Sequence, residues 1–193
     1  MKLHQMIEHY KLTPDPQGIK KAKTPEARAT YAFVFEPRET PSGEMKFQIC
    51  LIFPKDTNLK SVCQSIVNAA AAKFGADHSK WPKNLKSPIR DGDEERDGKE
   101  YENAWFMNAG NKNQPGIVDL QMQPIMSSDE FFSGCYCRAS LNFYGYDQSG
   151  NKGVGTGLNN ILKTKVGERL DGQTSAEEDF KEYAVEDDEA VDF

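Results

Sequence analysis

Aromatic and polar side chains alternate with apolar ones along residues 134–147. One set of alternating positions, from Cys135 to Phe143, is apolar. The other set joins three tyrosines to an arginine, a serine and an asparagine: Tyr136, Arg138, Ser140, Asn142, Tyr144 and Tyr146. Alternate residues of a strand project to opposite faces, so one face can be core while the other stacks bases on its rings and holds phosphates through arginine. The pattern favours a platform for single-stranded nucleic acid over its alternative, in which the tyrosines cover a second core layer or form cross-strand pairs.

Cationic side chains elsewhere in the chain could contact phosphates, which dominate non-specific affinity for nucleic acids. Any one of them is more often a solvated surface group, but together they predict a cationic groove. Three aromatic or arginine positions on earlier predicted strands are added to these cations. The expected contact residues outside the tyrosine strand are then Arg28, Tyr31, Lys83, Lys86, Arg90, Trp105, Lys112, Lys152, Lys163, Lys165 and Arg169.

An acidic cluster at residues 91–97 suggests a competing chemistry. Asp91 and Asp97 with Lys99 could surround magnesium in a nuclease. These residues lie in one polar turn rather than on converging strands, and as a calcium-binding loop the segment places Ala104 where a bidentate Glu is required. We therefore expect no enzymatic activity, no metal and no cofactor, with a metal-dependent nuclease kept as an alternative.

Other chemical motifs are weak. The four cysteines lack a second ligand pair for zinc, and the three histidines have no neighbouring nucleophile. The glycines between Gly150 and Gly157 do not form a phosphate-binding loop, because no Gly-Lys-Ser/Thr follows them. A hairpin turn with close backbone approach explains these glycines better.

The elements that position these residues are mostly strands. Alternation and β-branched or aromatic content predict strands over residues 29–35, 46–53, 101–109, 116–122, 134–146 and 158–166, with a turn at 40–43. One helix is expected between Thr57 and Gly75, where apolar residues recur at intervals of three and four. Residues 81–98 predict a long loop, and residues 1–23 an irregular N-terminal arm. The class is therefore mainly β, an antiparallel sheet or barrel with a helical insertion.

The C-terminus is strongly acidic. Residues 171–193 hold ten carboxylates against one lysine, a net charge of −9, while residues 1–170 hold 23 Lys and Arg against 20 Asp and Glu, a net charge of +3. Blocks of like charge resist collapse and commonly serve as interaction tails. We expect a disordered tail that competes with a polyanion for the cationic surface and offers partner proteins a binding segment at Asp187, Asp188, Asp192 and Phe193. The plainer alternative is a solubilising terminus.

Several short segments, in order along residues 28–180, resemble a family of phage-encoded single-stranded DNA-binding proteins with an OB fold, long catalogued as a domain of unknown function. They include residues 51–55 (LIFPK), 89–93 (IRDGD), 115–119 (PGIVD), 133–136 (SGCY), 142–144 (NFY), 151–154 (NKGV), 157–160 (GLNN) and 167–170 (GERL). The resemblance implies a five-stranded antiparallel Greek-key barrel over residues 24–170, after an arm at 1–23 and before the tail at 171–193. It also makes Arg90, Tyr136, Arg138, Tyr144 and Lys152 the foremost candidates for DNA contact.

The resemblance implies sequence-tolerant binding of single-stranded DNA during phage DNA replication or recombination, with replication proteins recruited by the tail. Duplex DNA as a second ligand and a homodimer both stay open. An acidic DNA mimic that occupies a host enzyme is a further alternative. No apolar run approaches the roughly 18 residues of a membrane span, so we expect no membrane association and a location in the cytoplasm of the bacterial host.

Overall fold

The computed structural model describes residues 1–172 and 179–183. Its helices are α1 (Leu3–Tyr10), α2 (Lys60–Phe74) and α3 (Gly92–Glu95), with 3-10 turns η1 (His78–Lys80), η2 (Lys99–Tyr101) and η3 (Lys181–Tyr183). Its strands are β1 (Lys21–Lys23), β2 (Ala27–Glu39), β3 (Met45–Pro54), β4 (Arg90–Asp91), β5 (Ala104–Asn111), β6 (Gly116–Val118), β7 (Tyr136–Gln148) and β8 (Asn151–Lys165). Strands dominate, as the sequence predicts.

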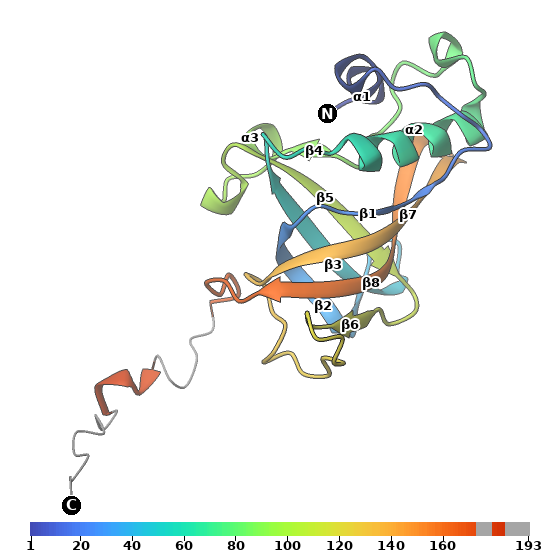
Figure 1. The fold of residues 1–193 in the computed structure, drawn as a ribbon. Coiled ribbons are helices and arrows are strands. Elements are labelled where there is room, and N and C mark those ends of the chain that lie inside the picture. The colour runs from blue at the N-terminus through green and yellow to red at the C-terminus, as the bar shows by residue number, and fades with distance from the viewer. Residues whose placement is uncertain (173–178, 184–193) are drawn as a thin grey trace, which may run out of the picture.

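Five strands close into a barrel in the order β2, β3, β5, β8, β7 and back to β2 (Figure 1). All contacts in this ring are antiparallel except β5 with β8, which run parallel and meet at Gly110 and Gly157. Short strands extend the edges: β1 pairs with β7, β6 with β8 and β4 with β5. The expected five-stranded Greek-key barrel is confirmed, with one parallel junction in place of a wholly antiparallel sheet.

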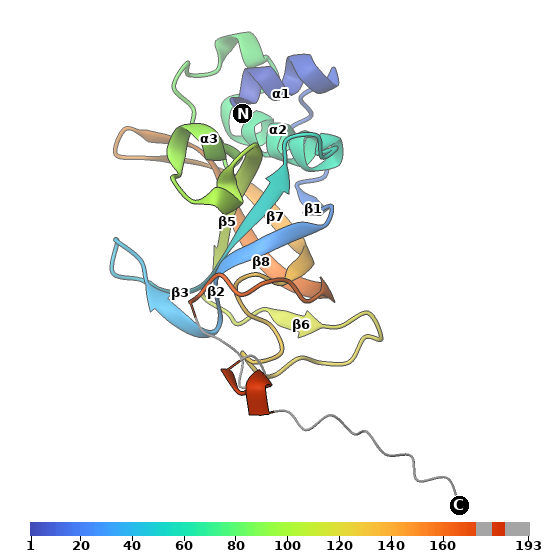
Figure 2. The ribbon, with the colours of Figure 1, turned by 90° about the vertical axis from the view of Figure 1, so that its left-hand side faces the viewer.

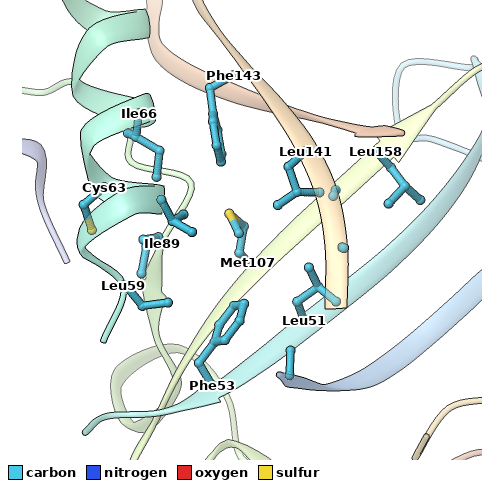
Figure 3. Packing of buried hydrophobic residues seen from close by; sticks show 14 of the residues in the cluster. Leu51, Phe53, Leu59, Cys63, Ile66, Ile89, Met107, Leu141, Phe143 and Leu158 are labelled. Carbon is cyan, nitrogen blue, oxygen red and sulfur yellow. The ribbon is translucent and has the colours of Figure 1, made fainter. Parts of the chain in front are cut away.

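Helix α2 covers one end of the barrel, and the core lies between them (Figure 3). Leu59 and Ile66 point from the helix region toward Met107 and Phe143 of the strands. The helix ends at Gly75, whose φ of 97° suits glycine, as expected. It begins at Lys60 with Leu59 as its N-cap, two residues later than an N-cap at Thr57 would give and three later than one at Asp56.

The expectation of an irregular N-terminal arm is wrong for residues 3–10. They form α1, which lies beside α2 (Figure 1), and Leu3, Met6 and Ile7 are buried in the core cluster. The apolar spacing of three and four over only eight residues is short for a sequence-based assignment, because isolated helices of this length are marginal in water. Packing on α2 supplies the stability that local propensity lacks.

Three other boundaries differ from expectation. Residues 81–98 contain β4 and α3 instead of being an unstructured loop, and the strand predicted from Gly116 ends at Val118. Strand β8 begins at Asn151, not at Leu158, so Gly153, Gly155 and Gly157 lie within a strand. The turn itself holds Gly150 at a φ of 81°, as expected.

Gly134 stands at the most demanding backbone position of this fold. Its φ is 118°, and a Cβ would lie 2.0 Å from the backbone oxygen of Glu168. We expect Gly134→Ala to lower the free energy of unfolding by about 2 kcal/mol or more, since strained backbone and a backbone clash add. Urea unfolding measures this. Gly150→Ala is the matched control: it has a similarly positive φ but open space around its Cβ, so a loss as large as that at Gly134 would contradict the clash.

Candidate nucleic-acid interface

The outer face of the barrel is defined by the residues that alternate with the core. On β7, Leu141 and Phe143 are buried while Asn142 and Tyr144 face outward. On β3 and β5 the buried Ile49 and Ala109 leave Gln48 and Gly110 on the outer side. Farther along the same side of these strands, Cys50, Ile52 and Phe106 are buried in a second cluster with Tyr101. The predicted two-faced character of the tyrosine strand is therefore confirmed.

One cross-strand row runs over this outer face through all five barrel strands. Its members pair successively in the sheet register: Asn142, Gly157, Gly110, Gln48 and Phe33. Because directly paired residues project to the same side of a sheet, these positions form a continuous band around the outside of the barrel, which we call the outer row. Two of its five members are glycines: Gly110 of β5 is partly exposed, while Gly157 of β8 is buried beneath the side chain of Asn142.

Glycines also let large side chains of β7 lie across β8. A Cβ on Gly155 would fall 2.6 Å from Cζ of Tyr144, and a Cβ on Gly157 would fall 2.5 Å from Oδ1 of Asn142. The Tyr144 ring therefore lies over the Gly155 backbone next to the outer row. Tyr144 is 51% exposed, so the ring retains surface on which a base can stack.

Two hairpins project to the same side of the barrel (Figure 2). The β2–β3 hairpin brings Lys46 to Glu44 at 2.7 Å, and the same carboxylate holds Lys112 at 2.9 Å. These two lysines keep the pKa of Glu44 low, at about 2. In the β7–β8 hairpin Lys152 pairs with Asp147 at 3.1 Å. Phosphates that bind here would compete with these exposed carboxylates for the lysines.

A second group of predicted residues gathers at Tyr136, in a different sheet row from Tyr144. The Nζ of Lys165 lies 4.3 Å and the guanidinium of Arg28 lies 5.9 Å from the ring centroid of Tyr136. Arg28 also donates to the backbone oxygen of Glu168, and Lys165 pairs with Glu26 at 3.2 Å. The three tyrosines that the sequence assigned to one platform therefore lie on different surfaces. Of the three, only Tyr144 adjoins the outer row.

The third tyrosine belongs to a cavity of about 750 Å³ between α1 and the barrel end. Tyr146, Lys86, Arg90 and Trp105 line this cavity. Burial raises the pKa of Tyr146, and the Nζ of Lys55 lies 5.0 Å from the ring centroid of Trp105. These four predicted residues therefore lie together, but against the N-terminal helix.

The remaining predicted contacts are dispersed. Tyr31 is 53% exposed on β2 at a register shift, with a φ of 46°. Arg138 is exposed on β7, Lys83 lies in the loop beside α1, and Lys163 donates to the backbone oxygen of Glu130. The guanidinium of Arg169 lies 3.9 Å from the ring centroid of Phe132. The tail positions Asp187, Asp188, Asp192 and Phe193 lie outside the described residues.

The acidic cluster that the nuclease alternative invokes forms ion pairs with Lys55 and Arg90 of the same chain. Nζ of Lys55 lies 2.8 Å from Asp91 and 2.6 Å from Asp93, and Arg90 pairs with Glu95. The hydrogen bond from Lys55 lowers the pKa of Asp93. In residues 1–172 and 179–183 no group of three or more His, Cys, Asp or Glu residues converges to hold a metal ion.

Sequence reasoning missed the outer-row residues Phe33, Gln48 and Gly110. A signal for part of the row was present: Gly153, Gly155 and Gly157 alternate with period two, the period of a strand. Since glycine is depleted in strands, the segment resembled a turn. The pairing of Gly110 with Gly157 joins residues far apart in the chain, which no local pattern reveals.

The closed five-stranded Greek-key barrel with a helix on one end is an OB fold. Solved structures share it. A single-stranded DNA-binding protein from bacteriophage Enc34, in complex with ssDNA, superposes with a TM-score of 0.67 at 23% identity, covering 82% of this chain and 98% of that chain. Gp2.5, a single-stranded DNA-binding protein encoded by bacteriophage T7, gives a TM-score of 0.58 at 13% identity, covering 91% and 100%.

Sequence comparison gives the family. Residues 20–191 match the family described as Enterobacter phage Enc34, ssDNA-binding protein, and the chain belongs to this family of phage single-stranded DNA-binding proteins. A relative named putative protein p50, from Acyrthosiphon pisum secondary endosymbiont phage 1, is 29% identical over 183 residues, which cover 89% of this chain and 98% of the relative. Helix α1 lies before the matched range.

Among the described helices, none has the length and apolar character that crossing a membrane requires.

Proposed function

We propose that this chain binds single-stranded DNA with little sequence preference, and that the DNA crosses the outer row between the two hairpins. The observation that carries the proposal is the Tyr144 ring laid over Gly155, half exposed, beside a row whose centre is glycine. Stacking on an aromatic ring tolerates any base, because every base has a π-face. Family membership and the ssDNA ligand of the Enc34 structure support the same ligand class.

The position of the outer row supports this choice of face. In OB folds the second and third barrel strands, with the loops that join strands 1–2 and 4–5, bind oligonucleotides. In this chain those elements are β3, β5 and the hairpins β2–β3 and β7–β8, which flank the outer row (Figure 2). The cluster at Tyr136 and the cavity at Trp105 are then secondary surfaces.

The role we propose is stoichiometric protection of single strands in phage DNA replication or recombination in the host cytoplasm, without catalysis. The acidic tail would compete with DNA for the cationic hairpins and recruit replication proteins. The charge contrast between residues 171–193 and the rest of the chain supports competition, because opposite charges attract over about 8 Å at physiological salt.

Salt dependence tests the electrostatic part of this binding. Each phosphate neutralised on a single strand contributes a slope of about −0.7 in log K against log salt, so about five contacts weaken binding roughly 100-fold between about 50 and 200 mM salt. Fluorescence anisotropy with labelled oligothymidine measures this slope, and tyrosine quenching reports stacking in the same titration. Absence of both binding and quenching would refute the proposed function.

A further inference from the structure

A cavity of about 370 Å³ opens between β2 and the loop that precedes β7. Its lining is rich in phenylalanine: Phe33, Phe35, Phe131 and Phe132. Phe131 is fully buried, while the other three are partly exposed, and Phe35 and Phe132 also pack against the core. This size lies in the range of small-ligand sites, which are typically apolar with a few polar groups that orient the ligand.

Two arginines belong to the same cavity, and each is placed against one of these rings. The guanidinium of Arg38 lies 4.8 Å from the ring centroid of Phe33, and that of Arg169 lies 3.9 Å from that of Phe132. Within the described residues Arg38 has a ring contact but no ion pair, and Arg169 has Asp171 at 3.6 Å. Stacking fixes the guanidinium planes and leaves N–H groups for an anion.

Three carboxylates also line the cavity: Glu36, Asp129 and Asp171. They disfavour a free anion deep in the cavity. They can accept hydrogen bonds from exocyclic amino groups, as Asp and Glu accept from cytosine N4 in base readout. The lining therefore suits a ligand with an aromatic, amino-bearing body and a phosphate at the arginine rim.

The cavity is continuous with the outer row. Phe33 is the last member of that row, paired with Gln48, and is also part of the cavity lining. A strand that follows the row from Tyr144 toward β2 would reach the cavity without leaving the protein surface.

We propose that this cavity is a nucleotide subsite that takes one unstacked, amino-bearing base of the bound single strand, with an adjacent phosphate at Arg38 and Arg169. The proposal rests on the proposed function and adds a site that the tyrosine pattern does not contain. Phe33 serves as the junction between the outer row and the subsite.

The test uses the full-length chain and oligodeoxycytidine. We expect Phe132→Leu, which removes the ring without removing the apolar contact, to weaken binding about tenfold, the effect of losing one base stack. Arg38→Gln, an exposed change, should weaken binding and reduce the salt slope by about 0.7, since one phosphate contact is lost. Phe74→Leu is the matched control, because Phe74 is also partly buried against the core but lies on α2.

The outcomes separate the subsite from the interface. Both variants weakened, with Phe74→Leu unchanged and all three melting like the parent, support the subsite. Phe132→Leu and Arg38→Gln binding as tightly as the parent or more tightly, while Tyr144→Ala is weakened, would overturn the subsite and leave the proposed function standing. If Tyr144→Ala also binds DNA as tightly as the parent chain, the result would count against the proposed interface itself.

Discussion

Deleting Glu177–Phe193 is expected to tighten binding of single-stranded DNA at low salt. The deletion removes nine carboxylates and one lysine from a chain whose residues 1–170 carry a net charge of +3. The proposed competition with phosphates for Lys46, Lys112 and Lys152 would mask these lysines until DNA displaces the tail. We expect roughly tenfold tighter binding at about 50 mM salt, with the gain vanishing at about 500 mM, where charges are screened beyond a few ångströms.

Anisotropy titrations of both chains across a salt series measure this effect. The control is a tail of unchanged length with every Asp and Glu of residues 177–193 replaced by Asn or Gln, which should match the deletion. Unchanged or weaker binding in the deletion would show that the tail does not compete with DNA. Removing Phe193 alone should leave DNA affinity intact and reduce capture of replication proteins.

Tyr144→Ala is expected to weaken single-stranded DNA binding by about tenfold, because one base stack is worth about 1–3 kcal/mol. Tyr144→Phe keeps the ring and should bind within about twofold of the parent chain. Since the side chain is 51% exposed, neither change should lower the melting temperature appreciably. A binding constant unaffected by Tyr144→Ala would show that DNA lies elsewhere.

Gly155→Val tests the same geometry without replacing the tyrosine. The new side chain would occupy the space now filled by the Tyr144 ring, since even a Cβ would lie 2.6 Å from Cζ. The ring must then leave its position over β8, so binding should weaken as in Tyr144→Ala.

Local patterns predicted the local features of this fold. The alternation along residues 134–146 correctly assigned Leu141 and Phe143 to the core face and Asn142 and Tyr144 to the outer face. Successive residues of a strand point to opposite faces, so a local pattern suffices for this assignment. The helix ending at Gly75 was predicted for the same reason. The resemblance of short ordered segments supplied the barrel topology, which periodicity alone leaves open.

Features that depend on distant contacts could not be predicted. Helix α1 is stable because Met6 and Ile7 reach the core under α2, and eight residues carry too little periodic signal to show this. The predicted cations were assigned to one groove, but their ion pairs and ring contacts place them in separate clusters around Glu44, Tyr136 and Trp105. A sequence gives the net charge of the chain, but the positions of the charged side chains in space depend on the fold.

The N-terminal helix also explains why some predicted DNA contacts lie apart from the outer row. The backbone N–H of Lys86 donates to the carbonyl oxygen of Lys152, and the N–H of Val154 donates to the carbonyl oxygen of Lys86. These bonds tie Lys86 to β8, and Tyr146 lines the cavity shared with α1. Aromatic residues on the same strand therefore differ in their surroundings, because different segments of the chain pack against each of them.

Photochemical cross-linking of the full-length chain to oligonucleotides carrying 5-iododeoxyuridine tests the central claim most directly. Mass spectrometry of the adducts should place them on Tyr144 and Phe33, on the outer face between the hairpins. Adducts confined to Trp105, Tyr146 or Tyr136 would contradict the claim, because the strand would then follow the helix-covered end or the far row of the barrel.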